Sequence, residues 1–218
     1  ATQIRLYEIP DIEKFYPAIA YPGGLPRRVM MMDWERQPEA PPADVARYCR
    51  FLGFNAVAPL ILKWGNAAYW PTKLGYERHD PAVMFKAMPA GKELDTWKAY
   101  LDAARDADLG ILPRLEYGGS TRLPKEAYAK KPDGGNAPVG RYASWGPNLL
   151  HPATWEEFAA LLDETVGGYY RDYPQLMGVL WRMRSERVCM SKGPNDIARY
   201  KQETGALDLA GYEDWWHG

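Results

Sequence analysis

Acidic, basic and aromatic residues gather at the ends of four short apolar runs of this chain. The runs cover residues 28–34, 55–64, 109–117 and 177–186. Three carboxylates stand at their carboxyl ends, Asp33, Glu116 and Glu186, and a positioned carboxyl group can act as general acid, general base or nucleophile. Cationic and aromatic residues stand at the same ends: Trp34, Lys63, Trp64, Tyr117 and Arg184. If the runs are parallel strands, these side chains meet at one edge, where such sheets carry their ligand sites.

Helical patterns separate the four runs. They cover about residues 43–52 and 94–107, a segment that begins near Thr154, and a segment from residue 195 or 196 to a stop at Gly205. In the third segment, Thr154 followed by Glu157 predicts a capping box. Strands that alternate with helices predict a parallel sheet, because parallel neighbours need a crossover connection.

The connections between these elements are unequal in length. Residues 65–93 and 118–150, which follow the second and third runs, are long and rich in Gly and Pro, whereas the helix-to-strand returns are short. This asymmetry is typical of a (β/α)8 TIM barrel, whose active site is built from the loops at the carboxyl ends of the strands. The sequence therefore predicts an α/β fold, a partial (β/α)8 barrel with four of the eight units.

The domain organisation follows from the same pattern. Residues 1–26 do not fit the repeat and read as an extension or linker, and residues 27–218 read as the barrel portion. A complete barrel needs about 250 residues, so a further half or a partner chain is expected to complete it, and the ending Trp215-Trp216-His217-Gly218 favours a truncated barrel. Open strand edges invite association, so residues 1–218 alone are not expected to form an active, stable monomer.

The parity of the strand residues predicts where the charges point. Arg114 and Glu116 share one face of the third run, and Arg182, Arg184 and Glu186 share one face of the fourth. Consecutive charges are costly under an apolar helix layer, so they fit the upper lumen of a barrel, where Arg and Glu neutralise one another. The alternative is an ion-pair network that only braces the barrel.

The pattern resembles the glycoside hydrolase (β/α)8 barrels and their uncharacterised glycosidase-like relatives. The segments that carry the resemblance are 28–34 as first strand, 147–152 (PNLLHP) and 170–186 (YRDYPQLMGVLWRMRSE). The resemblance implies a Glu acid/base at the end of the fourth strand, where Glu186 stands, although Ser185 precedes it instead of the usual Asn. The family's nucleophile lies on the seventh strand, which the four predicted units do not include.

Glycoside hydrolysis uses two carboxyl groups about 5–9.5 Å apart. The resemblance implies Glu186 and Glu116 as such a pair, with Asp33 as a third candidate and with Lys63 and Arg184 as further site residues. Flat aromatic rings with a polar edge suit sugar faces, and the candidates for stacking are Trp34, Trp64, Trp70, Tyr117 and Trp145. Core packing is the alternative for each of them.

Two other functions stay open. The chain could be a non-catalytic barrel that serves as a glycan-binding or assembly module. It could also be a lyase that forms a Schiff base through Lys63, unless that lysine is solvated or ion-paired.

Several classes of function find no support in the sequence. The net charge of −1 gives no electrostatic case for nucleic acid, and no apolar run approaches the roughly 20 residues of a membrane span. Nucleotide-binding, metal-binding and serine-hydrolase motifs are absent, so we expect carbohydrate as the partner and no cofactor or metal. The chain begins at Ala1, so a signal peptide could have been removed, and a glycosidase of this kind is expected to be secreted or periplasmic.

Overall fold

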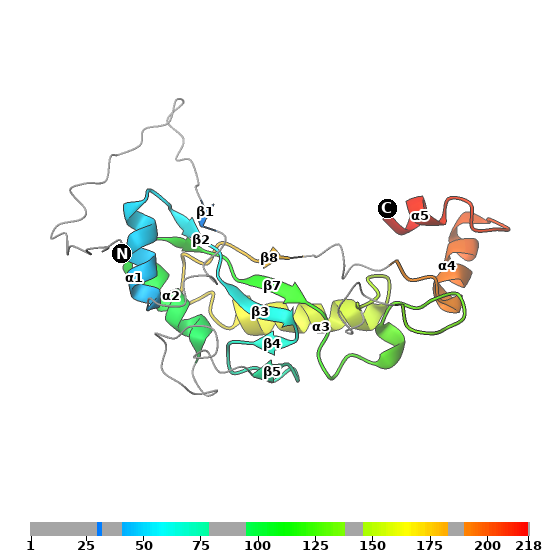
Figure 1. The fold of residues 1–218 in the computed structure, drawn as a ribbon, viewed down its shortest axis with the longest axis horizontal. Coiled ribbons are helices and arrows are strands. Elements are labelled where there is room, and N and C mark those ends of the chain that lie inside the picture. Colours follow the sequence, from blue (N-terminus) through cyan, green and yellow to red (C-terminus); the bar gives the residue numbers. More distant parts are fainter. Residues whose placement is uncertain (1–29, 32–40, 79–94, 138–145, 183–189, 218) are drawn as a thin grey trace, which may run out of the picture.

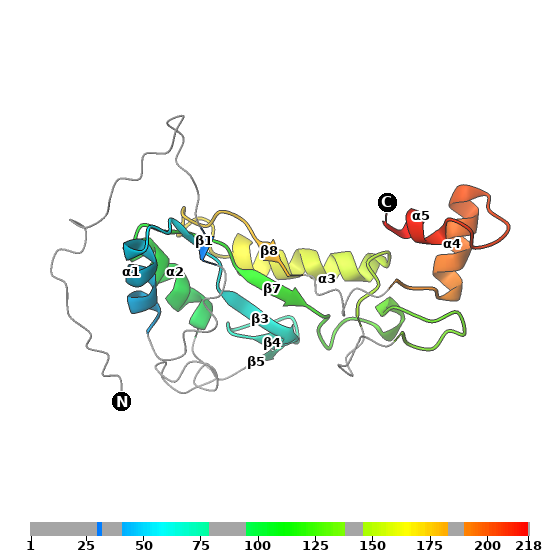
Figure 2. The ribbon, with the colours of Figure 1, turned by 45° about the horizontal axis from the view of Figure 1, so that its top comes forward.

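The computed structural model describes residues 30–31, 41–78, 95–137, 146–182 and 190–217 (Figures 1 and 2). The strands are β1 (Met30–Met31), β2 (Ala56–Val57), β3 (Leu60–Gly65), β4 (Ala67–Ala68), β5 (Glu77–Arg78), β6 (Gly110–Ile111), β7 (Arg114–Tyr117) and β8 (Leu180–Trp181). The α-helices are α1 (Pro42–Phe51), α2 (Thr96–Asp106), α3 (Pro152–Leu162), α4 (Pro194–Thr204) and α5 (Tyr212–His217). A 3-10 turn, η4 (Lys125–Ala127), and a π-helical turn, η5 (Asp163–Gly167), complete the elements. The predicted linker, residues 1–26, lies outside the described residues.

The pairings between the four predicted runs are all parallel and follow the order of the chain. β1 pairs with β2 and β2 with β6, and further along the same runs β3 pairs with β7 and β7 with β8. The predicted α/β class and parallel order are therefore confirmed. The described strands form a three-stranded sheet, β1-β2-β6, and a five-stranded sheet, β5-β4-β3-β7-β8, and the closed eight-stranded barrel stays a prediction.

Two prolines divide the central runs without interrupting the sheet. Pro59 separates β2 from β3, and Pro113 separates β6 from β7. Proline has no N–H to donate, but its carbonyl still accepts a hydrogen bond. The Arg114 N–H donates to the Pro59 carbonyl at 2.8 Å, and the Leu180 N–H donates to the Pro113 carbonyl at 2.9 Å. The ladder therefore continues across both breaks.

The sequence did not predict the hairpin that follows β3. Residues 65–93 were expected to be loop, yet β4 pairs antiparallel with β3, and β5 pairs in parallel with β4. Gly65 adopts a φ of 91°, which is the left-handed conformation that glycine tolerates, and the Asn66 N–H donates to the Lys63 carbonyl. This tight turn folds β4 back along the edge of β3.

Helices α1, α2 and α3 cover the larger hydrophobic core. α1 and α2 lie side by side, and α3 runs along the sheet, as both views show (Figures 1 and 2). The buried apolar side chains from these helices and from the strands form one cluster, which includes Val57, Ile61, Leu62, Trp97, Leu101, Ile111, Leu115, Phe158 and Leu161. Among the described residues, no helix has the length and apolar character of a bilayer span.

The predicted capping box at α3 does not form. The helix begins at Pro152, and His151 is its N-cap, with Nδ1 accepting from the Ala153 N–H at 3.2 Å. Proline is favoured at the first helical position because its φ is already helical, and this moves the start ahead of Thr154. The Thr154 hydroxyl donates to the Asn148 carbonyl instead. The predicted stop of α4 at Gly205 is confirmed, with a φ of 71°.

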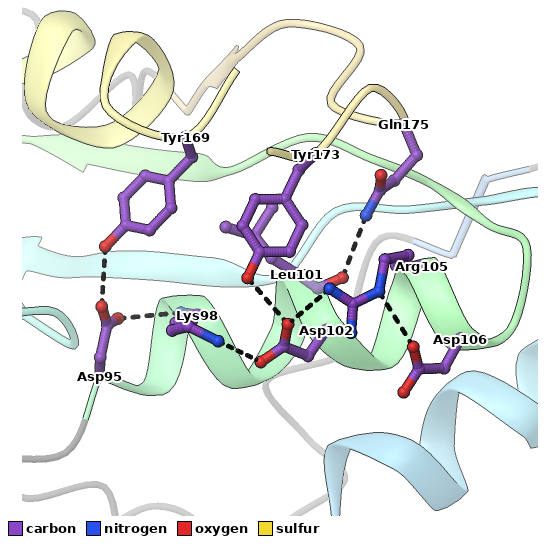
Figure 3. A network of polar contacts seen from close by, with 9 residues as sticks. All are labelled: Asp95, Lys98, Leu101, Asp102, Arg105, Asp106, Tyr169, Tyr173 and Gln175. Atoms are coloured by element: carbon purple, nitrogen blue, oxygen red, sulfur yellow. Dashed lines mark hydrogen bonds and ion pairs between the residues drawn. The ribbon is translucent and has the colours of Figure 1, made fainter. Parts of the chain in front are cut away.

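A polar clamp on α2 fixes the segment that leads into β8 (Figure 3). The Tyr169 hydroxyl donates to Asp95 at 2.7 Å, and the Tyr173 hydroxyl donates to Asp102 at 2.8 Å. The Gln175 side chain donates to the Leu101 carbonyl at 3.1 Å. Residues 169–175 are therefore held against α2 just before the fourth run begins.

We predict that Gly118→Ala destabilises the protein by about 1–3 kcal/mol, the usual range for overpacking a tight site. A Cβ at Gly118 would lie 2.7 Å from the Cα of Gly65, so the ends of β3 and β7 would have to separate. Gly168→Ala is the matched control, because its Cβ would meet nothing closer than 3.4 Å and its φ is −66°. Urea unfolding of the full protein measures both. Equal stability of the two variants would contradict this packing.

Candidate functional site

The predicted site residues divide into two groups. Asp33, Trp34, Trp145, Arg184 and Glu186 lie outside the described residues, as does the side chain of Trp64. Lys63, Trp70, Glu116 and Tyr117 are described. The site therefore has to be built from the ends of β3, β7 and β8.

An ion pair joins the ends of β7 and β8. Glu116 Oε1 lies 2.8 Å from Arg182 Nη1; the Glu116 side chain is fully buried, and that of Arg182 is 33% exposed. The sheet register sets this contact, because Arg114 pairs with Leu180 and the Arg182 N–H donates to the Leu115 carbonyl at 2.8 Å. The charged face predicted from parity thus brings an Arg and a Glu together.

Arg114 adds a second cation to the same strand face. It stands two residues before Glu116, so the two side chains project from one side of β7, and Arg114 is buried, with 3% of its surface exposed. A buried charge is stable only when it is paired or hydrogen-bonded. The end of β7 therefore carries a buried arginine and a buried glutamate on one face, and the glutamate is paired with Arg182.

Lys63 lies at the end of β3, on the neighbouring strand. It is half-buried, and its backbone pairs with Ala67 of β4. The sheet thus brings Lys63 to the same edge as Glu116, as the sequence predicted for strand-end residues.

Trp70 and Tyr117 have packing roles rather than open faces. Trp70 is 1% exposed, and its indole N–H donates to Glu164 at 2.9 Å. Tyr117 is 5% exposed, and its hydroxyl donates to the Thr154 carbonyl. Its ring makes a T-shaped contact with that of Phe158, with 5.3 Å between the ring centroids. A ring enclosed by protein has no face for a sugar, so we correct the prediction and place both in the core.

Glu157 is a site-positioning residue that the sequence did not reveal. Its Oε1 accepts from the Tyr76 hydroxyl at 2.8 Å and from the Ser120 N–H at 2.7 Å. Burial, followed by the nearby Glu157 carboxylate, raises the pKa of Tyr76 far above its usual value. The same two causes, burial first, raise the pKa of Tyr117. One carboxylate on α3 thus ties down the loop directly after Glu116 and Tyr117.

Glu164 fixes the segment between β4 and β5 in the same way. Its carboxylate accepts from the Trp70 indole, from the Thr72 hydroxyl at 2.7 Å and from the Lys73 N–H at 2.6 Å. Glu164 lies in the π-helical turn η5, and such turns are rare and often occur near functional sites. No motif in the sequence marks this contact, because its partners lie more than ninety residues away.

Metal ligands do not cluster in the part of the chain that the structure describes. No three or more His, Cys, Asp or Glu side chains there are placed to hold an ion.

Comparison with known proteins assigns no family. No protein-family model matches the chain, and no curated protein matches it. Solved structures similar to it include a bacterial fucosidase with a monovalent iminocyclitol inhibitor and an α-L-fucosidase GH29 from Bacteroides thetaiotaomicron, which is also found as a trapped covalent intermediate. Each is 12% identical with a TM-score of 0.39, and the match covers 68% of this chain but 28% of the fucosidase chain. At this level the similarity assigns neither a fold nor an activity.

We predict that Glu157→Ala lowers the free energy of unfolding by on the order of 2–6 kcal/mol. The change leaves the Tyr76 hydroxyl and the Ser120 N–H without their acceptor, and each such loss costs about 1–3 kcal/mol. Glu156→Ala is the control, because Glu156 is exposed on the same turn of α3 and its loss should change stability by less than about 0.5 kcal/mol. Chemical denaturation compares the two. An unchanged free energy of unfolding in Glu157→Ala would show that Glu157 does not hold Tyr76 and Ser120 as described.

Proposed function

We propose that this chain belongs to a carbohydrate-active, glycoside hydrolase-like protein that works with strand-end carboxylates. The observation that supports it is the buried Glu116 at the end of β7, paired with Arg182 at the end of β8 in a parallel sheet. Parallel α/β folds carry their chemistry at this edge. A carboxylate held there by a cation suits a reaction whose transition state develops positive charge.

The proposal gives the carboxylates different roles. Glu116, held by the Arg182 guanidinium, takes the anionic role of base, nucleophile or stabiliser of the oxocarbenium-like transition state. Glu186 takes the role of proton donor to the leaving oxygen, and Asp33 stays a further candidate. Both rest on the sequence, since neither is among the described residues.

Fewer aromatic residues remain as candidates for sugar binding than the sequence predicted. Trp34, Trp64 and Trp145 remain candidates for stacking on sugar rings, whereas the buried Trp70 and Tyr117 leave the set. Lys63 and Arg184 remain candidates for binding hydroxyl groups. The identity of the sugar is left to a panel of substrates.

The test is turnover of a panel of aryl glycosides by the full protein. We expect Glu186→Gln and Glu116→Gln to lower turnover by about a hundredfold or more, as loss of a catalytic carboxyl group does, whereas Glu156→Gln leaves turnover unchanged. Glycan binding without turnover would replace the proposal with a binding module. A borohydride-trapped substrate adduct at Lys63 would replace it with a lyase.

A further βα element is part of the same proposal. No described strand pairs with the outer edge of β8. Trp155 is 49% exposed, and its ring makes a T-shaped contact with that of Trp181 in β8, with 6.0 Å between the ring centroids. Phe158 of α3 already stacks on Trp181, with 4.5 Å between the ring centroids. A further strand beside β8 and a further helix beside α3 would cover the rest of this aromatic face. Either a further half of the barrel or a partner chain would supply them.

We predict that residues 1–218 associate or precipitate on their own, because no described strand pairs with the outer edge of β8 and the Trp155 indole beside Trp181 is exposed. Light scattering measures the mass, and Trp155→Lys should reduce association, whereas the control Glu156→Lys should not. A monodisperse monomer that melts cooperatively would contradict the proposed cover.

A further inference from the structure

A second, smaller hydrophobic core lies beyond the carboxyl ends of the strands. The core belongs to a part of the protein that we call the carboxyl-side lobe, which consists of residues 123–137, 146–150 and 190–217. Its core packs Tyr200, Tyr212 and Trp216 together with Leu149, Leu150, Met190, Ile197, Ala206 and Trp215. Both views place α4 and α5 past the ends of β3 and β7 (Figures 1 and 2). The lobe thus stands on the side of the sheet where the candidate site lies.

One buried carboxylate connects the separate segments of this lobe. Asp196, in the first turn of α4, is 9% exposed. Its Oδ1 accepts from the Asn148 side-chain amide at 2.8 Å, and its Oδ2 accepts from the Ser191 hydroxyl at 2.5 Å. The Ser191 oxygen in turn accepts from the Lys130 N–H at 3.0 Å. The two oxygens of this carboxyl group thus each meet a donor from a different segment of the chain.

Asn148 and Lys130 belong to the long loop that follows β7. The Asn148 N–H donates to the Ala127 carbonyl at 2.7 Å, and its own carbonyl accepts from the Thr154 hydroxyl at 2.8 Å. Asn148 therefore joins this loop to the start of α3. Asp196 holds the loop through that amide.

Ser191 belongs to the chain that follows β8, which is described again from Met190. The Ser191 carbonyl accepts from the Tyr212 hydroxyl at 2.5 Å, and the adjacent Lys192 N–H donates to the Lys130 carbonyl at 2.8 Å. At Gly193 the two segments are so close that a Cβ would lie 2.8 Å from the Cβ of Lys130. The segments after β7 and after β8 are thus in direct contact around Asp196.

We propose that Asp196 is a positioning residue that locks the loops after β7 and β8 together over the strand ends. Those two strands carry Glu116 and Arg182, so Asp196 sets how the flanks of the candidate site stand relative to each other. The role rests on the proposed function for its effect on turnover, but its effect on the loops is independent of it. Asp196 is buried within the lobe and acts through Asn148 and Ser191.

Hydrogen exchange measured by mass spectrometry in the full protein tests the lock. Asp196→Ala should speed exchange by at least about tenfold in residues 127–130 and 146–150 as well as in 190–193, and leave α1 and α2 unchanged. The control is Asn195→Ala, since Asn195 is exposed on the same turn. Faster exchange confined to α4, with the loop after β7 unaffected, would overturn the proposal.

Further variants keep the test informative if Asp196→Ala does not fold. Asp196→Asn keeps the side-chain shape and one acceptor, so it should show a smaller effect in the same segments, and Ser191→Ala should release residues 127–130. Unchanged exchange in the loop after β7 in both variants would equally overturn the lock.

Kinetics separate this inference from the proposed function. With a turned-over glycoside, Asp196→Ala should change KM and kcat by different factors, and Asp196→Asn should restore part of the loss. If Asp196→Ala speeds exchange in both segments but the protein turns over no glycoside, the proposed function is refuted and the lock stands. If the protein turns over a glycoside but Asp196→Ala leaves exchange in the loop after β7 unchanged, the lock is refuted and the proposed function stands.

Discussion

A carboxylate that is withdrawn from water needs a counter-charge, and in this fold the counter-charge stands on the next strand. Glu116 has no exposed side-chain surface, and the guanidinium of Arg182 lies 2.8 Å from it. Removing Arg182 leaves the buried Glu116 carboxylate without this counter-charge, which is far more costly than losing an exposed ion pair. The pair can form only if β7 and β8 are parallel and in the observed register, so the position of β8 governs the candidate site.

β8 has only two residues, so its position depends on contacts made outside the sheet. On one side the clamp of Figure 3 holds the segment before β8 against α2 through Tyr169 and Tyr173. The adjoining π-helical turn accepts the Trp97 indole N–H at the Thr165 carbonyl, at 2.9 Å. On the other side Trp181 stacks on Phe158 of α3. The helices therefore set the register that the short strand could not set alone, and the carboxyl-side lobe then secures the chain beyond it.

The elements that the sequence predicted correctly are those with local signals. Periodic apolar residues located α1 within one residue of its observed bounds, and Gly205 marked the end of α4. Strand parity placed Arg182 and Glu116 each on the charged face of its own run and predicted that Arg and Glu neutralise one another there. The unpredicted features depend on residues distant in sequence: Glu157 meets Tyr76 from 81 residues away, and Glu164 meets Trp70 from 94. Residue type alone did not show which way Trp70 and Tyr117 face, because a tryptophan or tyrosine suits a core and a sugar-binding cleft equally well.

The most direct test of this account is a double-mutant cycle between Glu116 and Arg182, measured by urea unfolding of the full protein. Glu116→Gln and Arg182→Met each leave one charge of the pair without its partner, whereas the double variant removes both charges of the pair. We expect each single change to cost about 3 kcal/mol and the double variant to recover part of that loss, with a coupling free energy of about 2 kcal/mol. Single effects that add to within about 0.5 kcal/mol would show that the two residues do not interact, and would contradict the placement of β8 beside β7.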